Sequence, residues 1–408
     1  MKSDNPEPSG SAHALQILFL TVFIDMVGFG IVVPVLPLYT ERFGASPFTI
    51  GTLLAVYSGM GFLFSPLVGI LSDRFGRKSI LLLSTVGQAA GFFIMGAANT
   101  LVWLFIARTI DGIFGANVSA TQAYVADVTP ESGRSKGMGL LGAAFGLGFI
   151  CGPLLGGVLS QMSLSTPFYF AGALAAANAV LIWLVLPESL SKATRIHRQG
   201  EPLLTVFQQG RGSTVGPLLT AYFFMMFGFA LMTAFFAIFT EDRFGFGATQ
   251  NGYVFAGIGV IAVIIQARLI GPLLSRFTEK RLALAGAAIL ACSLFALPLV
   301  QSIGALAVAC GGIAAGNSLI NPTVSGLASR SVNAFWQGRV MGLLQASASM
   351  GRCLGPIAGG WLLTLNSKHT PDFGKAPFWT GSALLIVSFL LMTGIPVRRE
   401  PWIEEAAR

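Results

Sequence analysis

The sequence predicts an all-α membrane protein with twelve transmembrane helices in two six-helix, pseudo-symmetric bundles. Three observations predict this fold. Apolar residues make up 54% of the 408-residue chain and charged residues only 10%, whereas soluble domains carry about 25% charged residues. The apolar residues gather into stretches of about 20, the length that crosses a bilayer. The two halves of the chain also resemble each other in sequence.

Twelve apolar stretches are long enough to span a membrane. In chain order they are residues 15–39, 48–72, 79–98, 101–126, 137–160, 167–187, 216–240, 249–275, 281–300, 303–328, 338–364 and 376–397. The first stretch is longer than the core of a signal peptide and contains an acid, so we interpret it as a span. The longest polar tract follows the sixth span. It divides the chain into a first bundle (1–187), a cytoplasmic linker (188–215) and a second bundle (216–408).

The positive charges indicate how the chain is oriented. If the N-terminus is cytoplasmic, the cytoplasmic segments, counted with the first residues of the spans next to them, hold 18 of the 25 Lys and Arg residues. The outer loops hold four, and three more lie inside spans. Cytoplasmic loops of membrane proteins are enriched in Lys and Arg. We therefore expect a multi-pass protein of the cell (inner) membrane with both termini in the cytoplasm. The net charge of +8 then faces anionic lipid, and no nucleic-acid partner is expected.

Four sequence blocks recur in the same order at an offset of about 200 residues. The clearest pairs are Gly69–Lys78 with Gly271–Lys280 and Gly148–Gly157 with Gly351–Gly360. Six spans per half make both halves enter the membrane from the same side. This arrangement predicts parallel repeats with a substrate site between them, near the middle of the membrane.

Enzymatic and metal sites are not expected. Four cysteines lie in apolar stretches without metal-ligand spacing, and the three histidines fall outside the spans. No nucleophile–histidine pair, zinc site or phosphate loop appears. We therefore expect no enzyme, no metal and no cofactor other than a proton gradient.

A charged turn joins the second and third spans. Its pattern is Gly69-x-x-x-Asp73-Arg74-Phe-Gly76-Arg77-Lys78. The glycine allows close helix packing, Asp73 can pair with a cation, and the basic residues suit the cytoplasmic surface. A solvated anchoring turn is the simpler interpretation.

The fifth span carries glycines at a regular spacing, at Gly148, Gly152, Gly156 and Gly157. Spacing of i, i+4 and i+8 makes a smooth face for close helix contact. Pro153 removes one backbone hydrogen bond and bends the helix. A general packing kink is the alternative reading.

Ionisable residues inside spans predict a functional site, because an unpaired charge there costs at least about 2.5–3.5 kcal/mol. Arg108 and Asp111 are three residues apart, on one helical face, and could be a self-neutralising structural pair. Asp25, in the first span, can carry a proton and release it when water or a cation arrives. It serves proton coupling or contact with a cationic substrate, or it is a buried acid satisfied by neighbouring donors.

Other polar and aromatic residues inside the spans are candidates for a substrate cavity. They are Asn117, Gln122, Phe227, Gln266, Asn317, Asn321, Gln345 and Arg352. Arg268 and Arg352 either snorkel, pair with an acid, or line the cavity and favour an anionic or zwitterionic substrate. Phe227 belongs to a phenylalanine cluster that either packs against neighbours or forms a wall for a drug.

These tracts resemble the major facilitator superfamily, and more narrowly its drug:proton antiporters with twelve spans, which include tetracycline efflux proteins. The resemblance covers nearly the whole chain. It implies that the charged turn pairs with Asp127, with Arg134 nearby, to form a cytoplasmic gate. It also implies that the fifth-span glycines form the exporters' antiporter motif, and that Arg108 and an acid in the first span take part in proton coupling.

The resemblance implies proton-coupled export of a small drug-like molecule or metabolite by alternating access, from a monomer in the lipid bilayer. Proton-coupled uptake or facilitated transport of a sugar, organic acid or siderophore is the alternative. The tetracycline exporters carry acids in spans three and nine and a histidine in span eight. The matching stretches here, 87–91, 289–292 and 259–262, contain neither, which argues against tetracycline with its metal as the substrate.

Overall fold

The computed structural model describes residues 8–129, 134–189, 212–332, 334–365, 368 and 370–395. The described part of the chain is helical and contains no strand. Its helices are α1 (Pro8–Glu41), α2 (Pro47–Phe75), α3 (Arg77–Ala97), α4 (Leu101–Phe114), α5 (Val118–Val128), α6 (Arg134–Leu159), α7 (Thr166–Val185), α9 (Gly212–Phe244), α10 (Ala248–Ile264), α11 (Ile270–Arg276), α12 (Glu279–Ala296), α13 (Ile303–Arg330), α14 (Ala334–Leu363) and α15 (Lys375–Thr393).

The helices confirm the expected all-α membrane fold. Among the described residues, eleven segments are long and apolar enough to cross a membrane. Helix α14 covers the remaining predicted span, residues 338–364. Most of the predicted linker, residues 188–215, lies outside the described residues.

The fourth span, predicted at residues 101–126, is present but is not one regular helix. Helix α4 ends at Phe114, and α5 begins at Val118 after a turn. Glycine lowers helix stability by about 1 kcal/mol relative to alanine, and Gly115 stands at the break. The side chain of Asn117 makes no cap bond to α5, so its amide is available for another partner.

The eighth span also departs from a regular α-helix. Between α10 and α11 the chain forms a π-helical turn, η3 (Ile265–Leu269). Such turns are rare and often occur at functional sites. This one contains Gln266 and Arg268, and no residue in it is buried.

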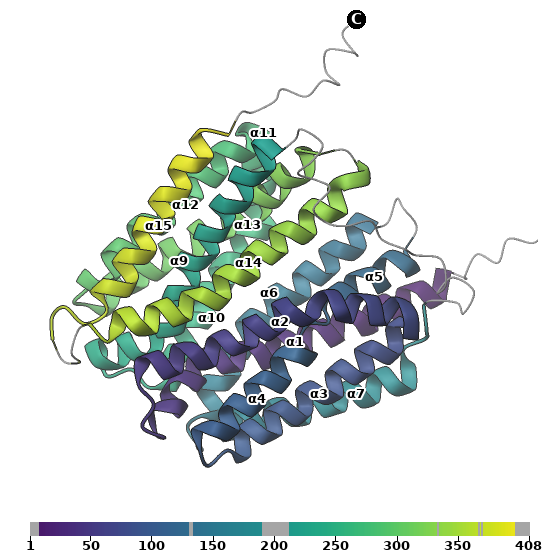
Figure 1. Cartoon of the computed structure of the whole chain (residues 1–408), viewed down its shortest axis with the longest axis horizontal. Helices are drawn as coiled ribbons and strands as arrows, with labels where there is room; N and C mark the ends of the chain where they lie inside the picture. The colour runs from purple at the N-terminus through teal and green to yellow at the C-terminus, as the bar shows by residue number, and fades with distance from the viewer. Residues whose placement is uncertain are drawn as a thin grey trace, which may run out of the picture.

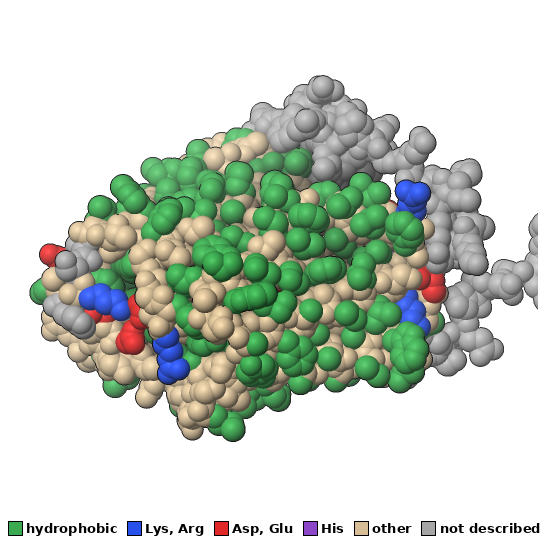
Figure 2. Space-filling model, turned by 60° about the horizontal axis from the view of Figure 1, so that its bottom comes forward, with side chains coloured by type: hydrophobic (Ala, Val, Ile, Leu, Met, Phe, Trp, Pro, Cys, Tyr) green, Lys and Arg blue, Asp and Glu red, His purple; other side chains and the backbone are tan. Residues whose placement is uncertain are grey.

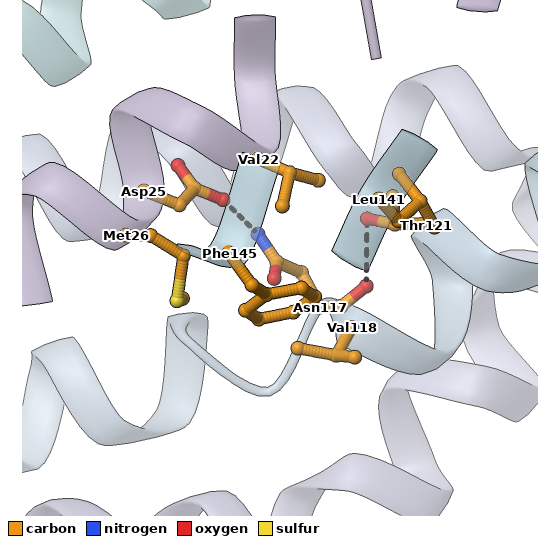
Figure 3. A pocket seen from close by; sticks show the side chains of 8 residues that line it. All are labelled: Val22, Asp25, Met26, Asn117, Val118, Thr121, Leu141 and Phe145. Atoms are coloured by element: carbon orange, nitrogen blue, oxygen red, sulfur yellow. Dashed lines mark hydrogen bonds between the residues drawn. The ribbon is translucent and has the colours of Figure 1, made fainter. Parts of the chain in front are cut away.

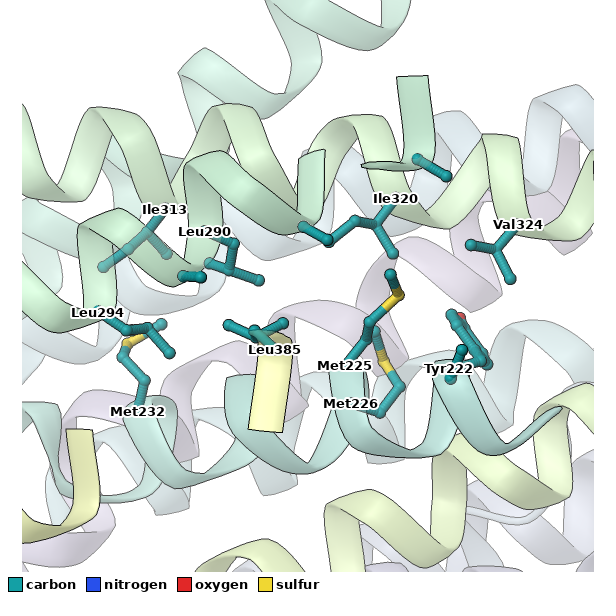
Figure 4. Packing of buried hydrophobic residues seen from close by; sticks show 14 of the residues in the cluster. Tyr222, Met225, Met226, Met232, Leu290, Leu294, Ile313, Ile320, Val324 and Leu385 are labelled. Atoms are coloured by element: carbon teal, nitrogen blue, oxygen red, sulfur yellow. The ribbon is translucent and has the colours of Figure 1, made fainter. Parts of the chain in front are cut away.

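Each half packs around its own apolar core. In the first half α1 lies against α6 and α7, and α3 lies against α4 and α7. In the second half α9 lies against α14 and α15, and α12 lies against α13 and α15. Figure 4 shows part of the second core, where side chains of α9, α12, α13 and α15 interlock, among them Met225, Leu290, Ile320 and Leu385.

Two matching lysine contacts support the sequence repeat. The Nζ atom of Lys78 donates to the carbonyl oxygen of Trp183, at 2.9 Å. The Nζ atom of Lys280, its counterpart in the second block, donates to the carbonyls of Thr393 and Ile395, at 2.8 and 2.6 Å. In both halves the lysine thus satisfies carbonyls at the end of the half's last helix, as expected near helix C-termini.

The halves meet through α2 against α14 and α6 against α10 (Figure 1). We call the end of the molecule where α1 begins and α15 finishes the termini end, and the opposite end the far end. At the far end glycines bring the halves together. A methyl group at Gly51 would lie 2.1 Å from the carbonyl oxygen of Pro356, and one at Gly252 would lie 2.5 Å from that of Pro153. An ion pair of 2.7 Å between Lys368 and Glu41 also joins the halves there.

The close approach of the halves does not extend to the termini end. Among the described residues, methyl groups at Gly139 and Gly142 of α6, at Gly271 of α11 or at Gly342 of α14 would meet no atom within 4 Å. The ribbons of the two halves also diverge toward α5 and α11 (Figure 1). The structure therefore has a tightly packed far end and a looser termini end.

The surface separates into an apolar belt and two charged ends. In Figure 2 hydrophobic side chains cover the middle of the visible face, and Lys, Arg, Asp and Glu gather toward its two ends. Large apolar side chains are exposed around the belt, including Ile70, Trp183, Val308 and Leu390. A belt of this kind is stable in contact with lipid tails and costly in water.

Candidate functional site

The first half contains a buried acid beside the α4–α5 turn. The Nδ2 atom of Asn117 donates to Oδ2 of Asp25, at 3.0 Å. The other carboxylate oxygen, Oδ1, is buried without a hydrogen-bond partner among the described residues. Figure 3 shows both side chains at the edge of a small pocket between α1, the α4–α5 turn and α6. The helix break positions Asn117 for this contact.

An ion pair lies next to Asp25. The Nη1 atom of Arg108 donates to Oδ2 of Asp111, at 2.7 Å, and both residues are buried. The Arg108 guanidinium lies 4.4 Å from the centre of the Tyr57 ring, in a cation–π arrangement. Its Nε atom is buried without a partner. The expected contact between Arg108 and Asp111 is therefore present, together with an aromatic neighbour from α2.

One cavity connects these groups. It is lined by Asp25, Tyr57, Gln88, Asp111 and Asn117, along with four apolar or glycine residues. It has room for about one water molecule. The two carboxyl groups can exchange protons with a water that enters this space, and the amides and the tyrosine hydroxyl can hold that water by hydrogen bonds.

The glycine face of α6 packs on the helix that carries Asp25. A methyl group at Gly148 would lie 2.4 Å from Cβ of Met26, and one at Gly152 would lie 2.7 Å from Cα of Gly30. At Gly157 it would lie 3.0 Å from the carbonyl oxygen of Thr249 in α10. Helix α6 thus contacts the acid-bearing helix and the opposite half at once.

The second half presents a different set of polar groups. The Tyr222 hydroxyl donates to Oδ1 of Asn321, at 2.8 Å, and Asn321 donates weakly to Asn317, at 3.4 Å. On α14, Arg352 donates to Oγ of Ser349, at 3.0 Å. The predicted candidates Asn317 and Asn321 thus contact each other, and Ser349 is a partner of Arg352 that the sequence did not single out.

Not every candidate lies in this region. The side chains of Gln122, Gln266 and Gln345 are exposed. Phe227 is half-buried; its ring lies 5.7 Å from that of Phe223, and its backbone packs on Gly351 of α14. The substrate-binding roles of these four residues stay predictions.

The charged turn forms a compact cluster at the termini end. Arg77 contacts Asp73 (2.5 Å), Asp127 (3.3 Å) and Ser72 (2.5 Å) through its guanidinium. Its backbone N–H donates to Glu188, at 2.8 Å. These contacts join α2, α3, α5 and the chain after α7, all within the first half. A gate between the halves would need an additional partner from the second half.

The other residues of the turn have separate roles. Gly76 adopts φ 104°, a left-handed value that favours glycine, where α2 ends and α3 begins. Gly69 lies against Ser119, and Arg74 is exposed. The side chain of Arg134 lies outside the described residues.

Sequence reasoning missed three residues of these sites. Tyr57 and Gln88 line the cavity, and Glu188 holds the start of α3. Tyr57 and Gln88 could have been found as polar groups in the middle of spans, the same signal that identified Asn117. Glu188 gave a weaker signal, because it stands at the beginning of a polar tract.

Comparisons with known proteins agree on one family. The family model described as Major Facilitator Superfamily matches residues 18–356 and 267–407. The chain is 33% identical to the tetracycline resistance protein, class C, of Escherichia coli, over 96% of this chain and 98% of that one. It is 31% identical to multidrug resistance protein 2 of Bacillus subtilis (strain 168), over 91% and 94%. A bacterial homolog of the human lysosomal transporter Spinster, solved in an inward-facing and occupied conformation, has the same fold. It shows 16% identity and a TM-score of 0.79 over 97% of this chain and 100% of that one.

Proposed function

The chain belongs to the Major Facilitator Superfamily, and on that premise we propose that it exports a small drug-like molecule or metabolite in exchange for protons. Membership makes it a multi-pass transporter of small molecules in the inner membrane. The names of its relatives, which refer to tetracycline and multidrug resistance, support export. Removing a drug from the cell is one direct way for a membrane transporter to confer resistance.

One observation carries the proposal of proton coupling. Asp25 is enclosed between the α4–α5 turn and α6, and its Oδ1 atom has no partner. A buried polar group without a partner is costly unless it has a function or is neutralised. A proton on Oδ1 would neutralise the group, and water or a cationic group entering the cavity would favour the carboxylate instead.

The neighbouring ion pair gives the site a second state. Asp111 and Tyr57 line the same cavity as Asp25, and Arg108 contacts both Asp111 and the Tyr57 ring. If Asp25 and Asp111 compete for Arg108 as the helices shift, protonation of one acid changes the partner of the other. Proton binding and helix movement would then be linked, which is what exchange transport needs.

The unequal ends of the molecule support alternating access. With both termini in the cytoplasm, the described state is closed at the outer, far end and looser at the cytoplasmic end. Export would require the glycine contacts at the far end to separate. The halves would then close at the termini end, where the Arg77 cluster could gain a partner from the second half and act as the gate.

Everted membrane vesicles test the proposed function. A proton gradient with an acidic interior is set up and followed with a fluorescent weak base. Compounds from a library that includes tetracycline are then added. We expect at least one compound to dissipate the gradient and to accumulate inside the vesicles, because its inward movement there corresponds to export from the cell.

Two variants make this test specific. Asp25→Asn and Asp111→Asn should reach the membrane and lose the dissipation. Asp372→Asn, which removes an exposed acid paired with Lys375, is the matched control and should behave as wild type. Normal coupling in both site variants would overturn the assignment of the proton sites. A compound that moves only down its own gradient would overturn exchange.

A further inference from the structure

We propose that Arg352 is a binding subsite for an oxyanion of the transported molecule, so that the substrate is an organic carboxylic acid or a zwitterion. This inference rests on the proposed transport function and names its substrate class. It is carried by an arginine in the membrane-spanning region that has no carboxylate partner among the described residues.

Arg352, which is half-buried, differs from the buried Arg77 and Arg108 in what it contacts. Arg108 is paired with Asp111, and Arg77 with Asp73 and Asp127. For Arg352 the described side-chain contact is the hydroxyl of Ser349, three residues earlier on α14. An arginine offers five N–H donors in a planar fork, so one serine leaves most of its hydrogen-bonding capacity unused.

Position on α14 places Arg352 at the junction of the halves. The methyl position of Gly59, on α2, lies 3.3 Å from Sγ of Cys353, the next residue. On the opposite side Gly351 packs on the backbone of Phe227 in α9. At the level of Arg352, helix α14 therefore lies between α2 of the first half and α9 of its own half.

Arg352 lies near two tyrosines, Tyr57 of the first half and Tyr222 of the second. The titratable groups that act electrostatically on its guanidinium are Tyr57 and Tyr222. Tyr57 is also under the influence of Asp25, Arg108 and Asp111. A molecule bound between the halves would thus have the carboxylates of the first half on one side and the Arg352 cation on the other.

In the sequence repeat, the counterpart of Arg352 in the first half is an aromatic residue that packs against a neighbour. In the matched blocks Arg352 corresponds to Phe149. Phe149 contributes an aromatic ring to a contact with Phe29, at 6.0 Å between ring centres. Phe149 needs no partner, whereas a guanidinium at the equivalent position is costly until an anion reaches it. The carboxylate of a bound substrate would be that anion, and arginine would hold it with charge-assisted, bidentate hydrogen bonds.

Binding measurements with matched compounds test this inference without a proton gradient. Purified protein in detergent is titrated with a panel of aromatic carboxylic acids and with the methyl ester of each. The panel includes rhodamine B and its ester, whose fluorescence polarisation reports binding directly. We expect at least one acid to bind about tenfold more tightly than its ester, a difference of about 1.4 kcal/mol.

Substitutions assign the preference to the proposed residue. Arg352→Gln should bind acid and ester equally, and Arg352→Lys should retain part of the preference because it keeps the charge and loses the fork. Arg276→Gln, which changes an exposed arginine at the end of α11 in the same half, is the matched control and should keep the full preference. If no acid binds more tightly than its ester, or if Arg352→Gln keeps the preference, the inference is overturned.

Thermal stability separates a ligand site from a structural role. Without ligand, Arg352→Met should melt at the same temperature as wild type or higher, because it removes a charge that has no carboxylate partner. A marked loss of stability would show that Arg352 holds the fold together, and would contradict the subsite. If wild type shows no preference for acid over ester but still exchanges protons, this inference alone is overturned and the proposed function stands.

Discussion

Asp25 and Asn117 are 92 residues apart in the chain and 3.0 Å apart in the structure. The sequence identified both, because each is a polar group in an apolar stretch. It did not predict their contact, which depends on the break between α4 and α5. An unbroken helix would have turned Asn117 to a different side.

Arg108 and Asp111 show what residue spacing can predict. A separation of three residues on a helix places two side chains within reach, and the two do pair at 2.7 Å. The cation–π contact with Tyr57 comes from another helix. Local spacing contains no information about a neighbour of that kind.

Removing one member of this buried pair should be costly. Arg108→Met leaves the Asp111 carboxylate uncompensated, and we expect a loss of about 3–5 kcal/mol of stability. The double variant Arg108→Met/Asp111→Leu should recover most of that loss without recovering transport. Thermal unfolding in detergent and vesicle transport measure the two effects.

An exposed pair provides the control for the charge deletion. Lys375 and Asp372 lie 2.6 Å apart near the far end, and exposed pairs contribute at most about 1 kcal/mol. Lys375→Met should therefore hardly change the unfolding temperature. If Arg108→Met changes the unfolding temperature equally little, Arg108 and Asp111 do not form the buried ion pair described above.

At the scale of elements, the length of the apolar stretches predicted the spans well. Helix-length apolar stretches match α1 to α15 within a few residues at most ends. Interruptions inside spans were missed at Gly115–Asn117 and at the π-helical turn of residues 265–269. Both lie in apolar surroundings where hydropathy stays high, so composition alone does not mark them.

The packing of α6 on α1 depends on glycines that spacing did predict. In Gly152→Ala a methyl group would come within 2.7 Å of the α1 backbone. Overpacking of this kind costs about 1–3 kcal/mol, so we expect a lower unfolding temperature and weaker transport. Circular dichroism melts and vesicle assays would show both.

A second glycine of the same helix is the matched control. A methyl group at Gly142 meets no atom within 4 Å, and alanine favours helix over glycine by about 1 kcal/mol. Gly142→Ala should therefore leave the melting temperature unchanged or raise it. Equal destabilisation by the two variants would show that the effect of Gly152→Ala does not come from contact with α1.

At the scale of the whole molecule, the repeat predicted two similar halves, and the paired contacts of Lys78 and Lys280 agree with that. Which ends of the halves touch could not be predicted. Glycines occur in most of the helices, and only the structure shows which of them, at the far end, face the other half.

A disulfide across the halves should stop the conformational cycle. In Gly59→Cys the new Cβ would lie 3.3 Å from Sγ of the native Cys353, close enough for an S–S bond of about 2.0 Å. We expect oxidation to link α2 to α14 and to abolish transport, and a reducing agent to restore it. Mobility of a chain cleaved in the linker, followed by gel electrophoresis, reports the cross-link.

Two variants control the cross-link. Gly59→Ser introduces a similar side chain without a thiol, and Gly139→Cys places a thiol where no atom lies within 4 Å. Neither should respond to oxidant. Full cross-linking of Gly59→Cys with undiminished transport would contradict movement of α2 against α14.

Proton release from the purified protein tests the central claim most directly. A compound that dissipates the gradient in vesicles is added to protein in weakly buffered detergent solution, and the pH is recorded with an indicator dye. We predict that wild type releases protons on binding, and that Asp25→Asn binds the compound and releases fewer. Equal release from Asp25→Asn and wild type would contradict the account.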